Sequence, residues 1–346
     1  MRKILLGLAG LVFLSWAAAA QEGAKPDEAP AATEQEKPEV AEGPVVVTVG
    51  SYIQNITEIN FRTNKVTVDF YIWFRWKGDD LAPHESFELV NGEVAESNVQ
   101  DVRKIGDVNY AYARVRAALS VPWDMDSFSL DRQVIPIMIE DRDADNTEMI
   151  YVVDKENVAV RKTIWLPGYK LGDQAGVIAT YTYDTNFGDP NLAPGTETTY
   201  SRYLHYVQIY RPDAAYFFKL FATMFLSTLV VAVAFALGPD NIDGRLGLGV
   251  GALFAVVATN YVISAQLPDT DTITLADKVN FLSMSVILLS LILAVASWRL
   301  HVREVRPQLV ALLDRVGLIV LPAFYLAYIA VMAINSRQDG SLAPTF

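Results

Sequence analysis

Hydrophobic positions divide the chain into two parts near residue 210. Up to that point short apolar runs alternate with polar residues, and beyond it long apolar stretches dominate. The first part contains runs rich in Val, Ile, Tyr and Trp, namely VVVTVGSYIQNI, KVTVDFYIWFRW, YAYARVRAALSV, RQVIPIMI, EMIYVVD, GVIATYTY and SRYLHYVQIY. Partial alternation between turn residues indicates strands rather than amphipathic helices. Regularly spaced short strands predict an immunoglobulin-like β-sandwich over residues 44–211.

The second part predicts a membrane domain. Its apolar stretches cover residues 215–237, 246–265, 279–296 and 316–334. Each is close to the roughly 20 residues that span about 30 Å of hydrocarbon. We therefore expect a four-helix transmembrane domain over residues 212–336, followed by a short C-terminal tail, 337–346.

The N-terminus indicates export. Arg2 and Lys3 precede an apolar run, and Ala18 and Ala20 suit cleavage before Gln21, so residues 1–20 are predicted to be a signal peptide. Residues 21–43 are rich in Pro, Ala and Glu, which predicts a disordered acidic leader. The chain has no cysteine, so disulfides and thiolate chemistry are excluded. Export without disulfides suggests a bacterial envelope protein.

Basic residues indicate the orientation in the membrane. The link between the third and fourth stretches carries Arg299, His301, Arg303 and Arg306, whereas the preceding link carries Asp269, Asp271 and Asp277. The positive-inside rule places the basic link in the cytoplasm. We expect a multi-pass protein of the bacterial inner (cell) membrane, with the N-terminal domain and the C-terminus in the periplasm or outside. The net charge is −12 without a basic patch, which argues against nucleic-acid binding.

Local motifs resemble those of pentameric ligand-gated ion channels, the Cys-loop receptor superfamily. The run PWDMDSFSLDRQ, residues 122–133, is similar to the family's signature loop, in which an acid and an aromatic precede Phe-Pro-Phe-Asp-x-Gln. Val121 and Ile135 stand where animal receptors have the disulfide cysteines, which bacterial relatives commonly lack. Residues 52–76 look like the first two strands of the same extracellular domain, and residues 243–270 resemble the pore helix and the loop after it.

Two positions depart from the family pattern. The segment HESFELVNGEVAESNVQDVRKIGDVN is short for the binding loop and lacks the usual Trp-x-Pro motif, and Ser129 replaces a proline in the signature loop. With those exceptions, the resemblance implies a homopentamer in a lipid bilayer, a pore lined by the second transmembrane helix, and sites between subunits for a small-molecule agonist that is not identified.

The second apolar stretch supplies the predicted pore-lining residues. At helical spacing, one face carries the set Asp243, Gly247, Gly251, Phe254, Ala258 and Tyr261. Rings of Phe254 and Tyr261 would form a barrier that closes by dewetting, and a ring of Asp243 carboxylates would favour cations. By resemblance, the side chain of Arg245 points away from the axis. Gly247-x-x-x-Gly251 is also a helix-packing pattern, which leaves that alternative open.

The resemblance also assigns residues that couple the sandwich to the membrane. Asp131 and Arg211 match a family pair that forms a buried salt bridge, and Glu58 is a candidate third member. Phe128 and Pro268 would pack beneath this pair. Ordinary surface charges are the alternative.

Aromatic residues are the candidate walls of the agonist site. The hairpin YTYDTNFGDPNLAPGTETTY resembles the loop that caps this pocket in the family. The candidate residues are Tyr71, Tyr112, Tyr181, Tyr183, Phe187, Tyr200 and Tyr203. Aromatic faces favour an amine through cation–π attraction, although tyrosines on strands often serve only in packing.

Other chemistry has little support. Asp141, Asp143 and Asp145 resemble the start of a calcium-binding loop, but the expected glycine and distal glutamate are absent, which favours a solvated acidic loop. We expect no cofactor, with modulation by a divalent cation as an open alternative. Three histidines scattered over two compartments do not suggest an enzyme. The rival function is a non-conducting envelope sensor or scaffold with the same fold.

Overall fold

The structure is a computed structural model that describes residues 43–188, 190, 192–193, 195–212, 214–269 and 271–338. The predicted signal peptide, the leader up to residue 42 and the tail from residue 339 lie outside the described residues.

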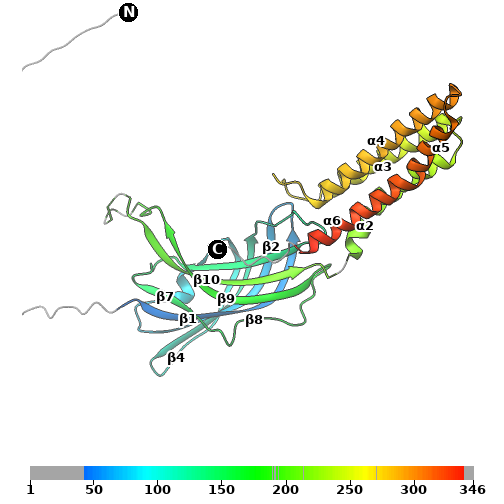
Figure 1. The fold of residues 1–346 in the computed structure, drawn as a ribbon. Helices are drawn as coiled ribbons and strands as arrows, with labels where there is room; N and C mark the ends of the chain where they lie inside the picture. Colours follow the sequence, from blue (N-terminus) through cyan, green and yellow to red (C-terminus); the bar gives the residue numbers. More distant parts are fainter. Residues whose placement is uncertain are drawn as a thin grey trace, which may run out of the picture. The chain divides into compact units, whose positions relative to one another are not determined.

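The N-terminal part is built of two antiparallel-rich sheets (Figure 1). The larger has six strands in the order β4-β5-β2-β1-β7, with β8 also pairing to β1, and the smaller has four in the order β3-β6-β10-β9. The larger sheet contains β1 (Val45–Asn60), β2 (Lys65–Lys77), β4 (Gly92–Ile105), β5 (Val108–Ser120), β7 (Met149–Val153) and β8 (Ala159–Val160). The smaller contains β3 (Phe87–Leu89), β6 (Arg132–Asp141), β9 (Lys170–Tyr183) and β10 (Thr198–Tyr210), and a short helix α1 (Pro83–Ser86) precedes β3.

Alternating side chains explain why these strands form a sandwich. On β2, every second residue from Val66 to Phe74 is buried, while the residues that alternate with them are only half-buried and face outward. Ile137 on β6 and Val207 on β10 belong to the same apolar core. Because each sheet buries one face against the other, the predicted β-sandwich is confirmed.

Three strands were not predicted, the short β3 and β8 and the long β4. Residues 92–105, interpreted from the sequence as a binding loop, form β4 at the edge of the larger sheet, paired with β5. Nearly all its side chains are exposed, so no alternation of apolar and polar residues marks it. Register shifts after Val94 and Val99 further interrupt its pattern.

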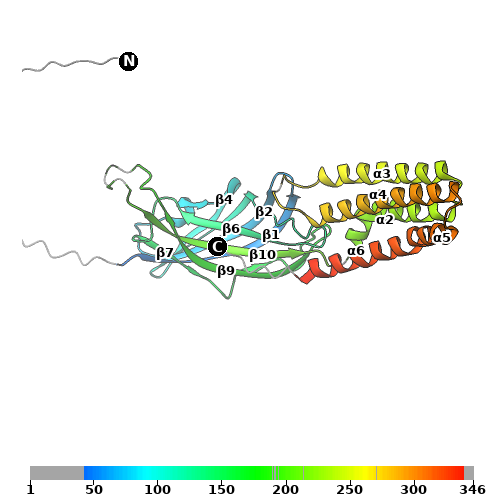
Figure 2. The ribbon, with the colours of Figure 1, turned by 45° about the horizontal axis from the view of Figure 1, so that its top comes forward.

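The C-terminal part consists of four helical segments that are long and apolar enough to cross a membrane. The first is α2 (Ala215–Val233) with the 3-10 turn η1 (Ala234–Ala236), the second is α3 (Ile242–Ser264), and the third is α4 (Leu275–Val302). The fourth joins α5 (Pro307–Arg315), the π-helical η2 (Val316–Val320) and α6 (Leu321–Gln338). They lie side by side (Figure 2).

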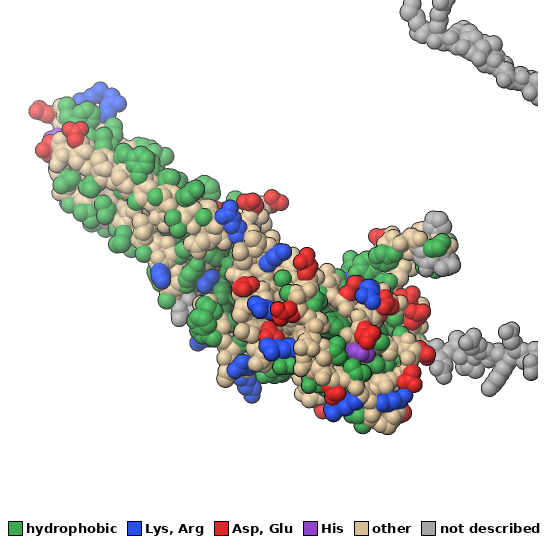
Figure 3. Space-filling model, turned by 180° about the vertical axis from the view of Figure 1, so that it is seen from behind, with side chains coloured by type: hydrophobic (Ala, Val, Ile, Leu, Met, Phe, Trp, Pro, Cys, Tyr) green, Lys and Arg blue, Asp and Glu red, His purple; other side chains and the backbone are tan. Residues whose placement is uncertain are grey.

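Surface chemistry agrees with this division. Figure 3 shows hydrophobic side chains along the helical segments, while charged side chains gather over the strands and at the far end of the helices.

Two of the helices begin at capping side chains. Asn241 accepts a hydrogen bond from the backbone of Gly244 at the start of α3, and Thr274 with Asp277 forms a capping box at the start of α4. A β-sandwich followed by four membrane-spanning helices is therefore the fold of the chain.

Candidate functional site

Helix α3 has one face that packs inside the chain. Its buried residues are Arg245, Gly249, Ala252, Val256 and Ile263. They are separated by three, four or seven positions, which places them in one stripe of an α-helix. A methyl group on Gly249 would overlap the side chain of Leu291 on α4, so this glycine permits close helix packing.

The predicted pore-lining residues lie on the opposite face of α3. Asp243, Gly247, Gly251, Phe254, Ala258 and Tyr261 are all exposed in the single chain. At about 3.6 residues per turn, this stripe is roughly half a turn from the buried one. Phe254 is 71% exposed and Tyr261 78%, and a methyl on Gly247 or Gly251 would meet nothing within 4 Å. The described part of the chain thus leaves this face uncovered, and the close intrachain packing falls on Gly249 rather than on the Gly247-x-x-x-Gly251 pair.

A buried ion pair lies between the sandwich and the first helix. The Nε of Arg211 is 2.9 Å from Oδ1 of Asp131, and the two side chains are 6% and 1% exposed. Asp131 Oδ2 accepts further bonds from the Tyr169 hydroxyl at 3.0 Å and from Gln133 Nε2 at 2.8 Å. The carboxylate is therefore fully occupied by donors, as a buried charge requires.

Aromatic rings enclose the Arg211 guanidinium. Its central carbon lies 3.9 Å from the ring centroid of Tyr216, 4.3 Å from that of Tyr169 and 5.8 Å from that of Phe128. Burial, and then the charge of Asp131, raise the pKa of Tyr169, which keeps its hydroxyl a donor. Because Tyr216 belongs to α2, this cation ties the end of β10 to the first membrane helix.

The signature loop also contacts other helices. Phe128 is buried and packs edge-to-face on Tyr216. The backbone N–H of Leu275, the first residue of α4, donates to the Asp126 carbonyl at 2.9 Å. Pro268 is half-buried in the turn between α3 and α4. The loop thus contacts the starts of α2 and α4.

Glu58 does not extend this ion pair. It is exposed within β1, at a positive φ of 53°, and its carboxylate accepts a bond from the Thr67 hydroxyl at 2.8 Å. The sequence placed it in a turn after the first strand, but β1 continues to Asn60. Within the described residues, its carboxylate has no ion-pair partner.

Four of the predicted ligand-binding residues form one aromatic cluster at the β9–β10 hairpin. Tyr183 lies 4.7 Å from Tyr181, 5.4 Å from Phe187 and 5.8 Å from Tyr200, measured between ring centroids. Two more of the predicted ligand-binding residues, Tyr71 and Tyr112, lie on the outward face of the larger sheet and are half-buried.

Tyr203 is a correction. It is fully buried and its hydroxyl lies 2.8 Å from the Ser51 hydroxyl inside the sandwich, so it cannot be a wall of an exposed pocket. Tyr200 and Tyr203 are three residues apart on one strand, and positions separated by an odd number point to opposite faces. That rule shows from the sequence alone that the two tyrosines cannot line the same face.

Sequence reasoning missed a charge pair beside the aromatic cluster. Arg202 Nε lies 2.7 Å from Glu140 Oε1, with side chains 11% and 2% exposed, and the Tyr183 hydroxyl donates to Glu140 Oε2 at 2.9 Å. The Arg202 guanidinium stands 3.9 Å over the Tyr181 ring. The chain's own cation thus occupies the ring face that was predicted to attract an amine.

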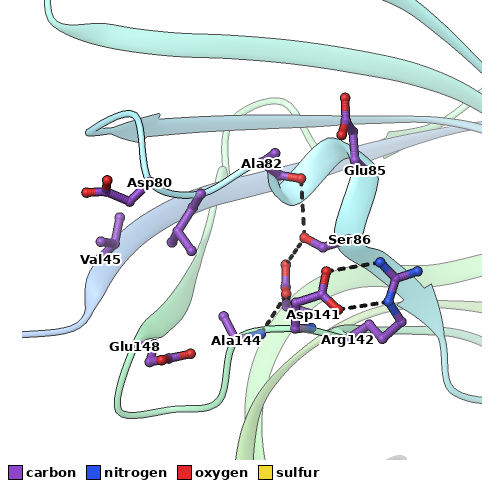
Figure 4. A pocket seen from close by; sticks show the side chains of 11 residues that line it. Val45, Asp80, Ala82, Glu85, Ser86, Asp141, Arg142, Ala144 and Glu148 are labelled. Atoms are coloured by element: carbon purple, nitrogen blue, oxygen red, sulfur yellow. Dashed lines mark hydrogen bonds and ion pairs between the residues drawn. The ribbon is translucent and has the colours of Figure 1, made fainter.

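The three candidate metal-binding acids do not converge. Asp141 is buried and accepts bonds from the Ser86 hydroxyl and from the backbone of Asp143 and Ala144 (Figure 4). Asp143 is exposed and pairs with Arg142, and Asp145 accepts from Thr147. Across the described ranges, no group of three His, Cys, Asp or Glu side chains is placed to hold a metal ion. Each of the three acids is instead bound by local donors.

A buried histidine was also missed. His205 is fully buried on β10, with Nδ1 2.7 Å from the Ser51 hydroxyl and Nε2 3.1 Å from Gln174 Oε1. Burial lowers its pKa to about 4. It is therefore neutral at pH 7 and supports the core as a hydrogen-bonded polar group.

Comparison with known proteins supports a channel. No family model matches the chain. The chain is 22% identical over 316 residues to a proton-gated ion channel of Gloeobacter violaceus, covering 86% of this chain and 84% of that protein. This relative is a channel rather than an enzyme, and the similarity includes most of the sandwich and the helices. Together with the four apolar helices, it supports a multi-pass membrane protein of the ion-channel kind.

Replacing Asp131 with Asn should destabilise the protein, because Arg211 would keep a buried charge without a counter-charge. The expected loss is about 3–5 kcal/mol of unfolding free energy. Thermal unfolding of the purified protein measures it. Glu58→Gln is the matched control, because that carboxylate is exposed, and it should change the stability by less than about 0.5 kcal/mol. Equal stabilities of Asp131→Asn and the parent would contradict a structural role for the pair.

The stability should also depend on pH through His205. Its folded pKa of about 4 lies below the ordinary value of 6.5, so between these values the unfolded chain binds more protons. The free energy of unfolding should therefore fall, by about 3 kcal/mol, as the pH drops from about 6.5 to about 4. His205→Gln should flatten this part of a pH series of thermal midpoints, whereas exposed His301→Gln should not. A slope that His205→Gln leaves unchanged would be the contrary result.

Proposed function

We propose that the chain is a subunit of a homopentameric ligand-gated ion channel, with α3 of each subunit lining a shared pore. The observation that carries the proposal is the uncovered face of α3, where an acid, two glycines and two bulky aromatic rings share one stripe. An Asp243 carboxylate in contact with hydrocarbon is costly, whereas one that faces water is not. Five such faces around an axis would give both the acid and the exposed backbone an aqueous environment.

Cation selectivity is the expected consequence. Asp243 lies exposed at the start of α3, whereas Arg245 is turned into the helical bundle. Five carboxylates near a narrow, low-dielectric passage attract cations and repel anions. The basic link after α4 supports a cytoplasmic position for this end, and we propose that the sandwich lies in the periplasm, with the helices in the inner membrane.

The stimulus is proposed to act on the sandwich and to reach the helices through the Asp131–Arg211 junction. The aromatic cluster at the β9–β10 hairpin is our candidate agonist site between subunits. Arg202 already occupies the face of Tyr181, so an amine is not favoured there. Because the relative is proton-gated, acidification is the first stimulus to apply.

Replacing Asp243 with Ala tests the function. Purified protein in a planar bilayer should pass current after the pH on the sandwich side is lowered, with a reversal potential in asymmetric NaCl that indicates cation permeation. Asp243→Ala should move this potential toward the chloride value, because the carboxylate ring is removed. Glu304→Ala, which removes an exposed acid from the link between α4 and α5, should not.

Two outcomes would oppose the proposal. Protein that assembles but passes no current under any stimulus would favour a non-conducting sensor or scaffold. Unchanged permeability in Asp243→Ala would remove the assignment of selectivity to this residue.

A further inference from the structure

Arg245 is held at the inner end of α3 by a residue 69 positions later in the chain. Its Nη1 lies 2.8 Å from Oδ1 of Asp314, and its Nη2 lies 3.0 Å from Oδ2, which is a bidentate ion pair. Nη2 also donates to the Leu237 carbonyl at 2.6 Å. The Arg245 side chain is 1% exposed, although α3 has an uncovered face on its other side.

Groups from several helices fix this pair. The Ser297 hydroxyl of α4 donates to Asp314 Oδ1 at 2.7 Å. The Phe235 ring of η1 lies 5.2 Å from the guanidinium, and Gly317 of η2 is so close that a methyl there would overlap that ring. Asp314 itself is on α5. The pair therefore joins α3 to the other three helical segments.

Asp314 is the one carboxylate that balances Arg245 in the described part of the chain. The Nε of Arg245 is buried and has no hydrogen-bond partner among the described residues. Removing Asp314 would leave a guanidinium with only the Leu237 carbonyl as an acceptor, in a low-dielectric setting. The positive charge of Arg245 would then either remain buried and add to the electrostatic field on the other side of α3, or draw the Arg245 side chain out toward water.

Either result would change the electrostatic potential at Asp243, which lies two residues before Arg245 in the same helix. An uncompensated positive charge so close in the helix would offset much of the field of the Asp243 carboxylate, because the buried guanidinium is poorly screened by water. With Asp314 in place, the arginine is neutralised within the bundle and Asp243 remains the net charge at the mouth.

We infer that Asp314 is a positioning residue for ion selectivity: by binding and neutralising Arg245 inside the bundle, it leaves the Asp243 ring to select cations. The inference rests on the proposed function, since it presupposes a pore along α3. It adds a residue of the fourth helical segment to the determinants of permeation.

Charge variants of the pair provide the test, measured as reversal potentials of the full chain in asymmetric NaCl. Asp314→Asn should lower the cation-to-anion permeability ratio about tenfold, the lower end of what focused charge does to local ion concentration. Arg245→Gln should not lower the ratio, because it leaves the negative charge of Asp314. The double variant Arg245→Gln, Asp314→Asn should return to the parent ratio, since it removes both charges. Asp314→Glu should retain the parent ratio.

Ser297→Ala is the matched control, because it removes one hydrogen bond to Asp314 and keeps both charges. It should leave the ratio unchanged. Gel filtration of each variant verifies assembly. If Asp314→Asn fails to assemble, the double variant provides the remaining test, because it buries no unpaired charge. A permeability ratio below that of the parent would overturn the inference, because Asp314 would then do more than neutralise Arg245.

The outcomes separate this inference from the proposed function. If the parent is cation-selective and Asp243→Ala reduces selectivity, while Asp314→Asn matches the parent, the inference is overturned and the function stands. It is also overturned if Asp314→Asn and the double variant lose selectivity equally, because the role would then be structural. If Asp243→Ala has no effect, the selectivity mechanism of the proposed function fails first.

Discussion

The two faces of α3 impose the main constraint on this protein. One face is buried against the neighbouring helices, and the other carries an aspartate, two glycines and two exposed rings that the described chain does not cover. Hydrocarbon is a poor environment for a carboxylate and for exposed helical backbone. Water shared between copies of the chain satisfies both groups, and the proposed pore would meet that requirement.

Two buried ion pairs connect distant parts of the molecule. Asp131 and Arg211 meet where the sandwich joins α2, and Arg245 and Asp314 meet at the other end of the helices. In each pair an arginine is bound by a carboxylate from a distant segment, so the arrangement is specific to this topology. Such pairs add little net stability relative to apolar packing, but an unpaired partner is strongly unfavourable. These ion pairs therefore fix how the segments are positioned more than they add to the stability of the fold.

The sequence predicted the elements that have a regular local pattern of apolar residues, and it missed those that form only through pairing with distant segments. The alternation on β2 and the apolar length of α3 are local properties, and both elements formed as expected. The edge strand β4 has no buried face, so nothing in its sequence marked it. Tyr203 was misplaced for a different reason, because it lies on the face of β10 opposite Tyr200 and is buried in the core.

The candidate site likewise contains residues that a local pattern predicts and residues that only the folded structure brings together. Helical spacing predicted six positions of α3 that are exposed together in the structure, because their relation depends only on the helix period. The partner of Arg245 is 69 residues away and that of Arg202 is 62 residues away, so neither could follow from a local pattern. The family resemblance predicted the Asp131–Arg211 pair. It also suggested Glu58 as a third member, but Glu58 lies within the longer β1 and accepts a hydrogen bond from Thr67 instead.

Thiol accessibility along α3 tests the central claim most directly, and the chain has no cysteine of its own to interfere. Single variants Ala258→Cys and Val256→Cys would be treated with a water-soluble thiol reagent in intact membranes. We expect modification of position 258, on the uncovered face, with a change in current, and no modification of position 256, which is buried. Rapid modification of position 256 with protection of position 258 would show that the uncovered face does not meet water.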